Sequence, residues 1–302
     1  LLSAPLLPLL NRLADAQDRH EPGPGRRRGR APPRRRVTPP RRVRIPRRMP
    51  AAGRPPAYAH LVLRITDART GQSVDAAPAR RGLTRVEVHV SGFDPGALRV
   101  LLVADTLVRA LELGGTPVWA VLTSGRQRRE LQAGATALGV RPFEDSRDVG
   151  SGLGEAQVIH VVEEGGATPD GVRLAVAPVD PGAPSAPQGT DPAVLRLALL
   201  AQPRTAPARF DTAALSEAHA TLARWRAAVA AWARQPSRPI PDEARVRLRT
   251  AWEDDLDLPA VLTTLSWVET SADLPEGARF ETYAYADRIL GLDLTRDLGA
   301  PA

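Results

Sequence analysis

The sequence of 302 residues predicts an α/β domain followed by an all-α domain. Across residues 58–177, apolar positions alternate between the two-residue period of strands and the three-to-four-residue period of helices. Across residues 190–298 only the helical period occurs, and the intervening residues 178–189, rich in proline, glycine and serine, are expected to be a linker. Strands that alternate with helices pair in parallel, so we expect a parallel sheet followed by a helical bundle.

Four strands and two helices are expected in the α/β part. The strands are predicted at residues 60–65, 85–90, 118–122 and 158–162, and the helices at residues 96–113 and 127–138. In the second strand Val86, Val88 and Val90 alternate with polar residues, which is typical of a strand with one buried face. Ligands of open parallel sheets bind beyond the carboxyl ends of the strands, so the expected site is the turn after Val90.

Five helices are expected in the all-α part. Asp191 and Asp211 stand where N-cap residues belong, and Pro236 follows the helix that Asp211 begins. The first helix contains Leu195, and the last three are predicted near residues 242–252, 259–270 and 276–290. Each carries an apolar stripe, which by default packs into a core.

The positive charge of the chain is concentrated at its start. Residues 1–48 carry 14 arginines and three acidic residues, a net charge of +11, so the rest of the chain carries −4 of the total of +7. Residues 1–57 are therefore expected to form a disordered arm rich in arginine and proline. Two interpretations stay open. In the first, residues 26–48 bind nucleic-acid phosphates. In the second, the residues before Met49 are not translated. The second rests on two facts: the chain begins with leucine, and Met49 is its only methionine.

The chain contains neither lysine nor cysteine, and all 41 basic residues are arginines. The lack of cysteine excludes disulfides, thiolate metal sites and a cysteine nucleophile, so any metal site would need histidines and carboxylates. The longest apolar stretch, residues 1–10, is interrupted by two prolines and is too short to span a membrane. We expect a soluble cytoplasmic protein with no membrane partner.

Several motifs occur in a characteristic order. They lie at residues 63–67, 70–71, 86–92, 105–107, 191–192, 195–200, 222–226, 254–260 and 289–292. This order resembles the cysteine-activating class I ligases, the family of cysteinyl-tRNA synthetase and the mycothiol-pathway cysteine ligase. The resemblance covers residues 61–125 and 190–294. It implies a Rossmann-like domain of the class I synthetase kind, reduced in size, and ATP as the cofactor.

The resemblance also implies a nucleotide site, but most of its residues are changed. The family's His-Ile-Gly-His signature corresponds to residues 94–97, so Gly96 and the nearby Arg99 remain while both histidines are lost. Gly92, Gly96 and Arg99 are the expected cofactor-binding residues. The family's first zinc cysteine corresponds to Ser91, whose hydroxyl does not replace a thiolate, so zinc is not expected. The lysine-containing loop of the family is absent, and we assign no catalytic residue and no metal ligand.

Three functions remain open. We favour a degenerate, shortened paralogue that keeps the nucleotide-binding fold and acts as a binding or partner protein for an unknown protein or small molecule. The second is an active ATP-dependent ligase that adenylates cysteine or another amino acid, with Arg99 and Arg126 replacing the signature lysines. The third is nucleic-acid binding through the arm at residues 26–48. tRNA is not an expected partner, because the sequence ends before any anticodon-binding domain.

Three further groups are weighed as sites. Residues 150–154, Gly-Ser-Gly-Leu-Gly, are similar to a dinucleotide loop but precede a strand, so a flexible turn is expected. The aspartates at 254, 255 and 257 could hold a divalent cation, but we favour Asp257 as a helix N-cap with its neighbours at the positive end of the helix. His160 with the glutamates at 163 and 164 is either a ligand or acid–base group or, as we favour, structural.

Overall fold

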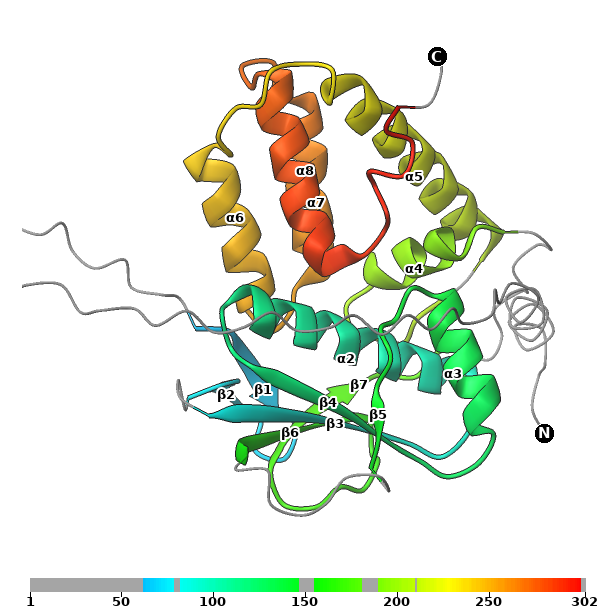
Figure 1. Cartoon of the computed structure of the whole chain (residues 1–302). Helices are drawn as coiled ribbons and strands as arrows, with labels where there is room; N and C mark the ends of the chain where they lie inside the picture. Colours follow the sequence, from blue (N-terminus) through cyan, green and yellow to red (C-terminus); the bar gives the residue numbers. More distant parts are fainter. Residues whose placement is uncertain (1–61, 79–81, 147–154, 181–189, 210, 300–302) are drawn as a thin grey trace, which may run out of the picture.

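The computed structural model of the chain describes residues 62–78, 82–146, 155–180, 190–209 and 211–299. A five-stranded sheet with two helices lies beneath five further helices (Figure 1). The predicted fold class, α/β followed by all-α, is confirmed. The predictions for residues 1–57, for the loop at 150–154 and for most of the linker at 178–189 concern residues outside the described part.

The main sheet is entirely parallel and has the order β5-β4-β3-β6-β7. Its strands are β3 (Leu83–Val90), β4 (Val118–Ser124), β5 (Glu144–Asp145), β6 (Glu155–Glu163) and β7 (Val172–Val176). From the central β3 the chain adds strands on one side, and it then returns to add β6 and β7 on the other side. The direction of growth therefore changes between β3 and β6, where the loops of such sheets diverge and ligands bind.

The first predicted strand is wrong in both position and partner. β1 (Arg64–Asp67) turns at Gly71 and pairs antiparallel with β2 (Gln72–Asp75) in a separate hairpin. The hairpin adjoins β7, because the amide of Ala68 donates to the carbonyl of Arg173 at 2.8 Å. The sequence pattern does not predict β2, β5 or β7, since the first two are short and polar and the third has only five residues.

Two helices cover one face of the sheet. They are α2 (Pro95–Leu113) and α3 (Arg128–Ala137), both within a residue of their predicted bounds. Fifteen of the 19 residues of α2 are buried, because this helix lies between the sheet and the upper helices (Figure 1). Within the described part of the chain, no helix covers the opposite face of the sheet (Figure 1). Polar side chains of the central strands are therefore found on that face.

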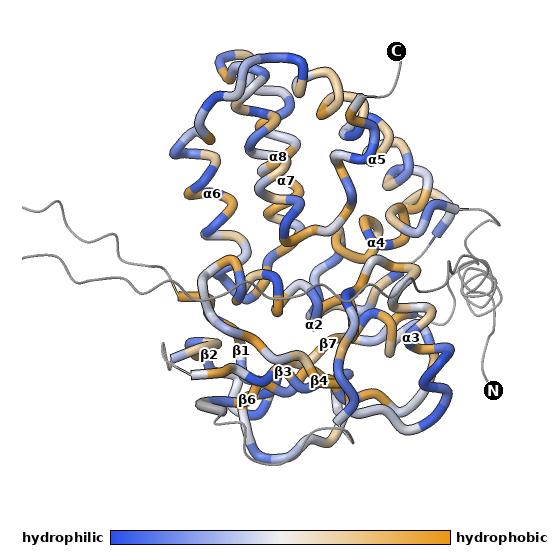
Figure 2. The backbone as a smooth tube through the Cα atoms, in the orientation of Figure 1, coloured by the Kyte–Doolittle hydropathy of each residue, from blue (hydrophilic) through white to orange (hydrophobic). Residues whose placement is uncertain are grey.

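The upper helices form the predicted bundle. They are α4 (Pro192–Leu200), α5 (Thr212–Trp232), α6 (Asp242–Glu253), α7 (Leu258–Thr270) and α8 (Glu276–Leu290). Asp191 and Asp211 cap α4 and α5 as predicted, accepting backbone amides at 2.9 and 2.6 Å. Figure 2 shows hydrophobic residues along α4, which packs between α5 and the α/β layer.

Aromatic residues fill the centre of the bundle. Tyr283 is fully buried, with its ring edge-on to Trp225 and Trp232 at centroid distances of 5.7 and 5.1 Å. Its hydroxyl donates to the carbonyl of Leu265 at 2.8 Å, so the one polar atom of the ring is satisfied. The predicted role of the helix-spaced tryptophans in core packing is confirmed. Among the described residues, no helix has the length and apolar content needed to cross a membrane.

Candidate functional site

Two carboxyl groups meet at the N-terminus of α2, beyond the carboxyl ends of β3 and β6. Asp94 is the N-cap, and its Oδ1 accepts the amide of Ala97 at 2.8 Å. Glu163, the last residue of β6, reaches the same place: a Cβ added to Gly96 would lie 2.8 Å from Glu163 Oε1 and 3.1 Å from Asp94 Oδ1. The lack of a side chain at Gly96 thus makes room for the glutamate.

The charge at this point is the reverse of what a phosphate requires. A free helix N-terminus binds phosphate through its unpaired amides and its partial positive charge. Here Asp94 takes one of those amides, and the Glu163 carboxyl adds a second negative group. Partial loss of hydration, with the nearby charge of Asp94, raises the pKa of Glu163 above its ordinary value. Two carboxyl groups therefore occupy the position in which a nucleotide phosphate would approach the helix.

The turn after β4 closes one side of the predicted site. Gly125 and Arg126 donate their amides to the carbonyls of Val90 and Ser91 at 3.3 and 3.2 Å. A Cβ at Gly125 would lie 2.6 Å from the carbonyl oxygen of Ser91, so only glycine fits this approach. Gly92 lies next to this turn, and Arg126 is exposed at its outer side. Gly92 thus lies in the loop before α2 and Gly96 in the first turn of α2, and their assignment to cofactor binding stays a prediction.

Arg99 lies elsewhere, inside the protein, with 2% of its surface exposed. Its guanidinium donates to the carbonyl oxygens of Ala177, Pro178, Pro203 and Ala206 at 2.6, 3.1, 2.7 and 2.8 Å. Burial lowers the pKa of Arg99 to about 10. The assignment of Arg99 to nucleotide binding stays a prediction, and these contacts weigh against it, because the guanidinium joins α2 to the segments that follow β7 and α4.

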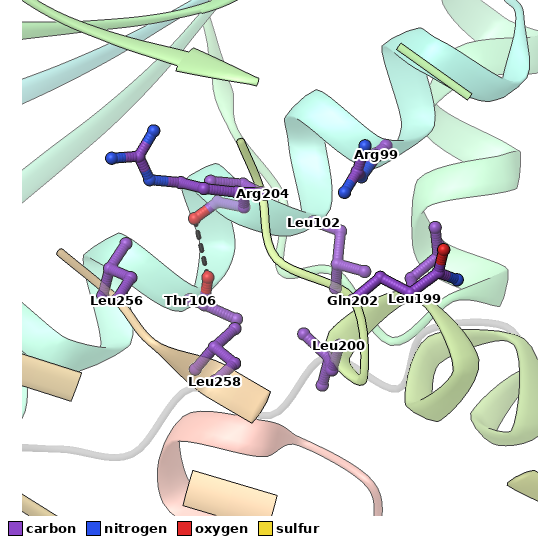
Figure 3. A pocket seen from close by; sticks show the side chains of 10 residues that line it. Arg99, Leu102, Thr106, Leu199, Leu200, Gln202, Arg204, Leu256 and Leu258 are labelled. Atoms are coloured by element: carbon purple, nitrogen blue, oxygen red, sulfur yellow. Dashed lines mark hydrogen bonds between the residues drawn. The ribbon is translucent and has the colours of Figure 1, made fainter. Parts of the chain in front are cut away.

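A small pocket lies beside Arg99 (Figure 3). Leucines from α2, α4 and the start of α7 line it, and the guanidinium of Arg204 points away from them (Figure 3). Its volume of about 20 Å³ has room for roughly one water molecule. This space is far too small for a nucleotide.

A larger cavity, of about 550 Å³, lies at the other end of α2. It is bounded by the β1–β2 hairpin, the last turn of α2, and helices α6 and α8. Its lining includes Leu63, Asp75, Leu111, Arg249, Trp252 and Tyr285. This volume falls within the range of small-molecule sites, and the lining combines apolar surface with a few polar groups, as such sites do.

A buried network around Asp105 joins the two parts of the protein. The side chain of Asp105 is fully buried in α2 and accepts from Arg196 and Arg109 at 2.8 Å each and from Arg141 Nε at 3.0 Å. Burial alone would raise the pKa of Asp105, but Arg196 and Arg109 hold it below its ordinary value. Arg196, on α4, also donates to the carbonyls of Leu138 and Leu290 at 2.9 and 2.5 Å. This one arginine therefore connects α2, the end of α3, α4 and the end of α8.

Arg226 makes a second set of these connections. It donates to Asp191 Oδ2 at 2.8 Å and to the carbonyl of Leu292 at 2.9 Å, so α5 is joined to the start of α4 and to the segment after α8. Asp255, described below, makes a third set of such contacts. We use the term 'joint' for these three groups together: the Asp105 network, the Arg226 contacts and the Asp255 contacts.

Asp255 connects the bundle to the β1–β2 hairpin. Its carboxylate accepts the amide and hydroxyl of Thr66 at 2.8 and 2.9 Å and pairs with Arg204. The Asp255 carboxylate is thus engaged by the hairpin and by Arg204, and its expected role at the positive end of α7 stays a prediction. Asp257 does cap α7, accepting the amide of Ala260 at 3.0 Å, as predicted.

A polar cluster lies on the face of the sheet that lacks a helix. His160 Nδ1 and His89 Nε2 are 2.8 Å apart, and each lies 3.9 Å from a carboxylate oxygen of Glu87. Thr123 donates its hydroxyl to Glu87 Oε1 at 2.9 Å. The structure does not bring His160 together with the glutamates at 163 and 164. Glu163, three residues further along the strand, faces the opposite side of the sheet, and Glu164 lies beyond the end of β6.

Sequence analysis does not identify Glu87 or His89 as site residues. The signal is nevertheless present, because the alternation with Val86 and Val88 places both polar side chains on one face of the strand. What the sequence lacks is the register, which sets His160 of β6 opposite Glu87 of β3.

Comparison with known proteins identifies relatives. No family model matches the chain. It is 37% identical over 111 residues to the L-cysteine:1D-myo-inositol 2-amino-2-deoxy-alpha-D-glucopyranoside ligase of Nocardiopsis dassonvillei, 35% of this chain and 26% of the relative. Equally named proteins of Streptomyces griseus, 36% over 111 residues, and of a Parafrankia species, 36% over 116 residues, align over 35% of this chain and 26% and 25% of their own lengths.

The chain is similar to these cysteine ligases. The resemblance inferred from the ordered motifs is thereby confirmed. The chain spans about a quarter of the length of the curated relatives it matches. The motifs on which the resemblance was based lie largely at the joint, which contains residues from the segments at 63–67, 105–107, 191–192, 195–200, 222–226, 254–260 and 289–292.

Proposed function

We propose that this chain is a cysteine ligase-like protein that does not form an adenylate and acts as a binding or partner protein. The observation that carries the proposal is the Glu163 carboxyl against Gly96, beside the Asp94 cap. A phosphate placed there would meet like charge at short range, which costs free energy instead of gaining it. The sequence contains no lysine, so only arginines could neutralise a phosphate.

The joint supports the proposal that the chain keeps the fold of the ligases but not their catalytic activity. Its central pair, Asp105 and Arg196, is buried, and removing one partner of such a pair costs a large part of the free energy of unfolding. Residues that hold two layers together remain useful in a protein that catalyses nothing. A cytoplasmic location stays a prediction.

The binding role has a candidate location in the 550 Å³ cavity at the far end of α2. Trp252 and Tyr285 line it and meet edge-on at 5.5 Å, which gives a preorganised aromatic wall. We propose an unidentified small molecule or protein segment as the occupant. Nucleic-acid binding by this chain through residues 26–48 is a separate prediction, and those residues lie outside the described part.

An active ATP-dependent ligase is the second candidate. One observation favours it: Arg126 is exposed at the carboxyl edge of the sheet, where a guanidinium could clamp a phosphate. Arg99 does not support it, because carbonyl oxygens engage its guanidinium. The attraction of this single exposed arginine for a phosphate would have to exceed the repulsion from the two carboxyl groups at the N-terminus of α2.

Calorimetric titration of Mg-ATP into the purified chain tests the proposal. We expect no binding up to about 1 mM ATP, an affinity weaker than about −4 kcal/mol. The double variant Asp94→Asn/Glu163→Gln keeps a capping side chain but removes both charges, and it should bind ATP more tightly than the unchanged protein. Glu164→Gln, a matched control one residue further on, should not. Micromolar binding of ATP by the unchanged chain would overturn the proposal.

A further inference from the structure

We propose that Glu87, His89 and His160 form a binding site for one Zn²⁺ ion on the helix-free face of the sheet. The three side chains come from two neighbouring strands, β3 and β6, whose register places His160 directly opposite Glu87. Neutral imidazole nitrogens and a carboxylate oxygen are established zinc ligands, and two histidines with one glutamate make a complete set of three protein ligands. This inference is independent of the proposed function.

The distances between the candidate ligand atoms suit a small ion. His89 Nε2, His160 Nδ1 and a Glu87 oxygen all lie within 4.8 Å of one another. Zinc bonds of about 2.0–2.1 Å in a tetrahedron place two ligand atoms about 3.3 Å apart. The 2.8 Å between the two nitrogens would therefore open by about half an ångström. His89 Nε2 lies 3.9 Å from Glu87 Oε1 and His160 Nδ1 lies 3.9 Å from Glu87 Oε2, so the carboxylate would have to turn to bring one oxygen toward both nitrogens.

Neighbouring groups already orient two of the ligands. Thr123 donates its hydroxyl to Glu87 Oε1 at 2.9 Å, which leaves Oε2 toward His160 at 3.9 Å. His160 makes a hydrogen bond with the backbone of Asp170, and a Cβ at Gly171 would lie 3.0 Å from its Nε2, so Nε2 faces that loop and Nδ1 faces the cluster. Outer hydrogen bonds of this kind fix the tautomer and direction of metal-binding histidines.

Burial and neighbouring charges both affect how the cluster would bind a cation. Burial lowers the pKa of His89 and of His160. Arg85 lies 3.6 Å from Glu87 Oε2, and Arg173 also acts electrostatically on both histidines. These two cations weaken the attraction for Zn²⁺, and Arg85 competes with the ion for Glu87 Oε2, whereas the two histidine nitrogens face one another.

The site is reachable and differs from the zinc position implied by the family resemblance. The side chains of Glu87 and His89 are 13% and 14% exposed, whereas His160 is 2% exposed, so an ion can enter from the solvent side. The resemblance implies a cysteine at Ser91, beyond the end of β3. None of the three proposed ligands occupies that position.

Titration of the purified full chain, free of any histidine tag, with Co²⁺ and then Zn²⁺ tests the site. We expect one equivalent of Co²⁺ to give the visible absorption of a low-symmetry, four- or five-coordinate ion, and Zn²⁺ to abolish it by displacement. Glu87→Gln and His89→Gln should each weaken binding at least about 10-fold. Both replacements preserve side-chain size, and circular dichroism checks that each variant is folded.

His219→Gln is the matched control, since His219 is exposed on α5, away from the cluster. It should bind as the unchanged chain does. The absence of stoichiometric Co²⁺ or Zn²⁺ binding, or equal affinity in the folded Glu87 and His89 variants, would overturn the proposal. Loss of binding in the His219 variant would overturn it too, because the metal would then lie elsewhere.

Discussion

Arg196 Nη2 donates to Asp105 Oδ2 at 2.8 Å, and both side chains are buried, with 1% and 0% exposed. The pair joins α4 of the bundle to α2 of the α/β layer. Arg196 uses its other nitrogens on the carbonyls of Leu138 and Leu290, so the cation is satisfied from three elements. A buried ion pair of this kind is stable only because its hydrogen bonds are complete.

Replacing Asp105 with alanine should destabilise the protein by about 3–5 kcal/mol, because Arg196 then stays buried without a counterion. Urea unfolding followed by circular dichroism measures the change. Glu243→Ala serves as the control. Glu243 pairs with Arg247 on the surface of α6, where such pairs contribute at most about 1 kcal/mol. A loss for Asp105→Ala no larger than that of the control would contradict the role assigned to the joint.

Gly291→Ala should destabilise more than Gly139→Ala. Both glycines have positive φ angles, +60° and +68°, so each alanine pays a similar backbone cost of about 1–2 kcal/mol. At Gly291 the new Cβ would lie 2.9 Å from Arg196 Nη2 and 3.2 Å from Arg109 Cζ, whereas at Gly139 nothing is closer than 3.7 Å. The same urea experiment compares them. Equal losses would show that the joint tolerates displacement of Arg196.

Glu163→Gln should stabilise the protein near neutral pH but not near pH 4. The pKa of Glu163 is raised in the folded state, so between about 4.5 and that raised value the folded chain binds more protons than the unfolded chain. Stability of the unchanged protein therefore falls as pH rises through this range, and glutamine removes the effect. Because Glu163 is largely exposed, the gain should be below about 1 kcal/mol.

Unfolding by urea at pH values of about 4 and about 7 measures this difference. Glu164→Gln is again the control and should show no such pH-dependent gain. A Glu163 variant that is less stable than the unchanged protein at neutral pH would mean that the carboxylate stabilises the helix N-terminus, contrary to this account.

The long elements of the fold could be predicted from the sequence because their hydrophobic periods are unambiguous. α2 and α5 are examples, since caps and apolar stripes agree along 19 and 21 residues. The hairpin could not be predicted in the same way, because β2 has one apolar residue in four and its pairing depends on the turn at Gly71. β5 consists of two acidic residues, which carry no strand signal at all.

The candidate site could be predicted only in part. The rule that ligands bind beyond the carboxyl ends of parallel strands predicts a site at the turn after Val90. Gly92 lies in this turn, and Gly96 lies in the first turn of α2, which follows it. The approach of Glu163 could not be predicted, because it depends on β6 being the neighbour of β3, which is a property of strand order. From the sequence, Arg99 is assigned to phosphate binding because an arginine near the start of a helix is typical of such sites. The sequence does not show that its long side chain reaches inward and donates to carbonyl groups.

Cysteine-dependent exchange of pyrophosphate into ATP by the purified chain tests the central claim most directly. If carboxyl groups close the nucleotide site, the chain should give no exchange above the enzyme-free background, with or without added Zn²⁺. Exchange that requires both cysteine and the chain, and that is lost in Arg126→Ala, would contradict the account and establish the protein as an active ligase.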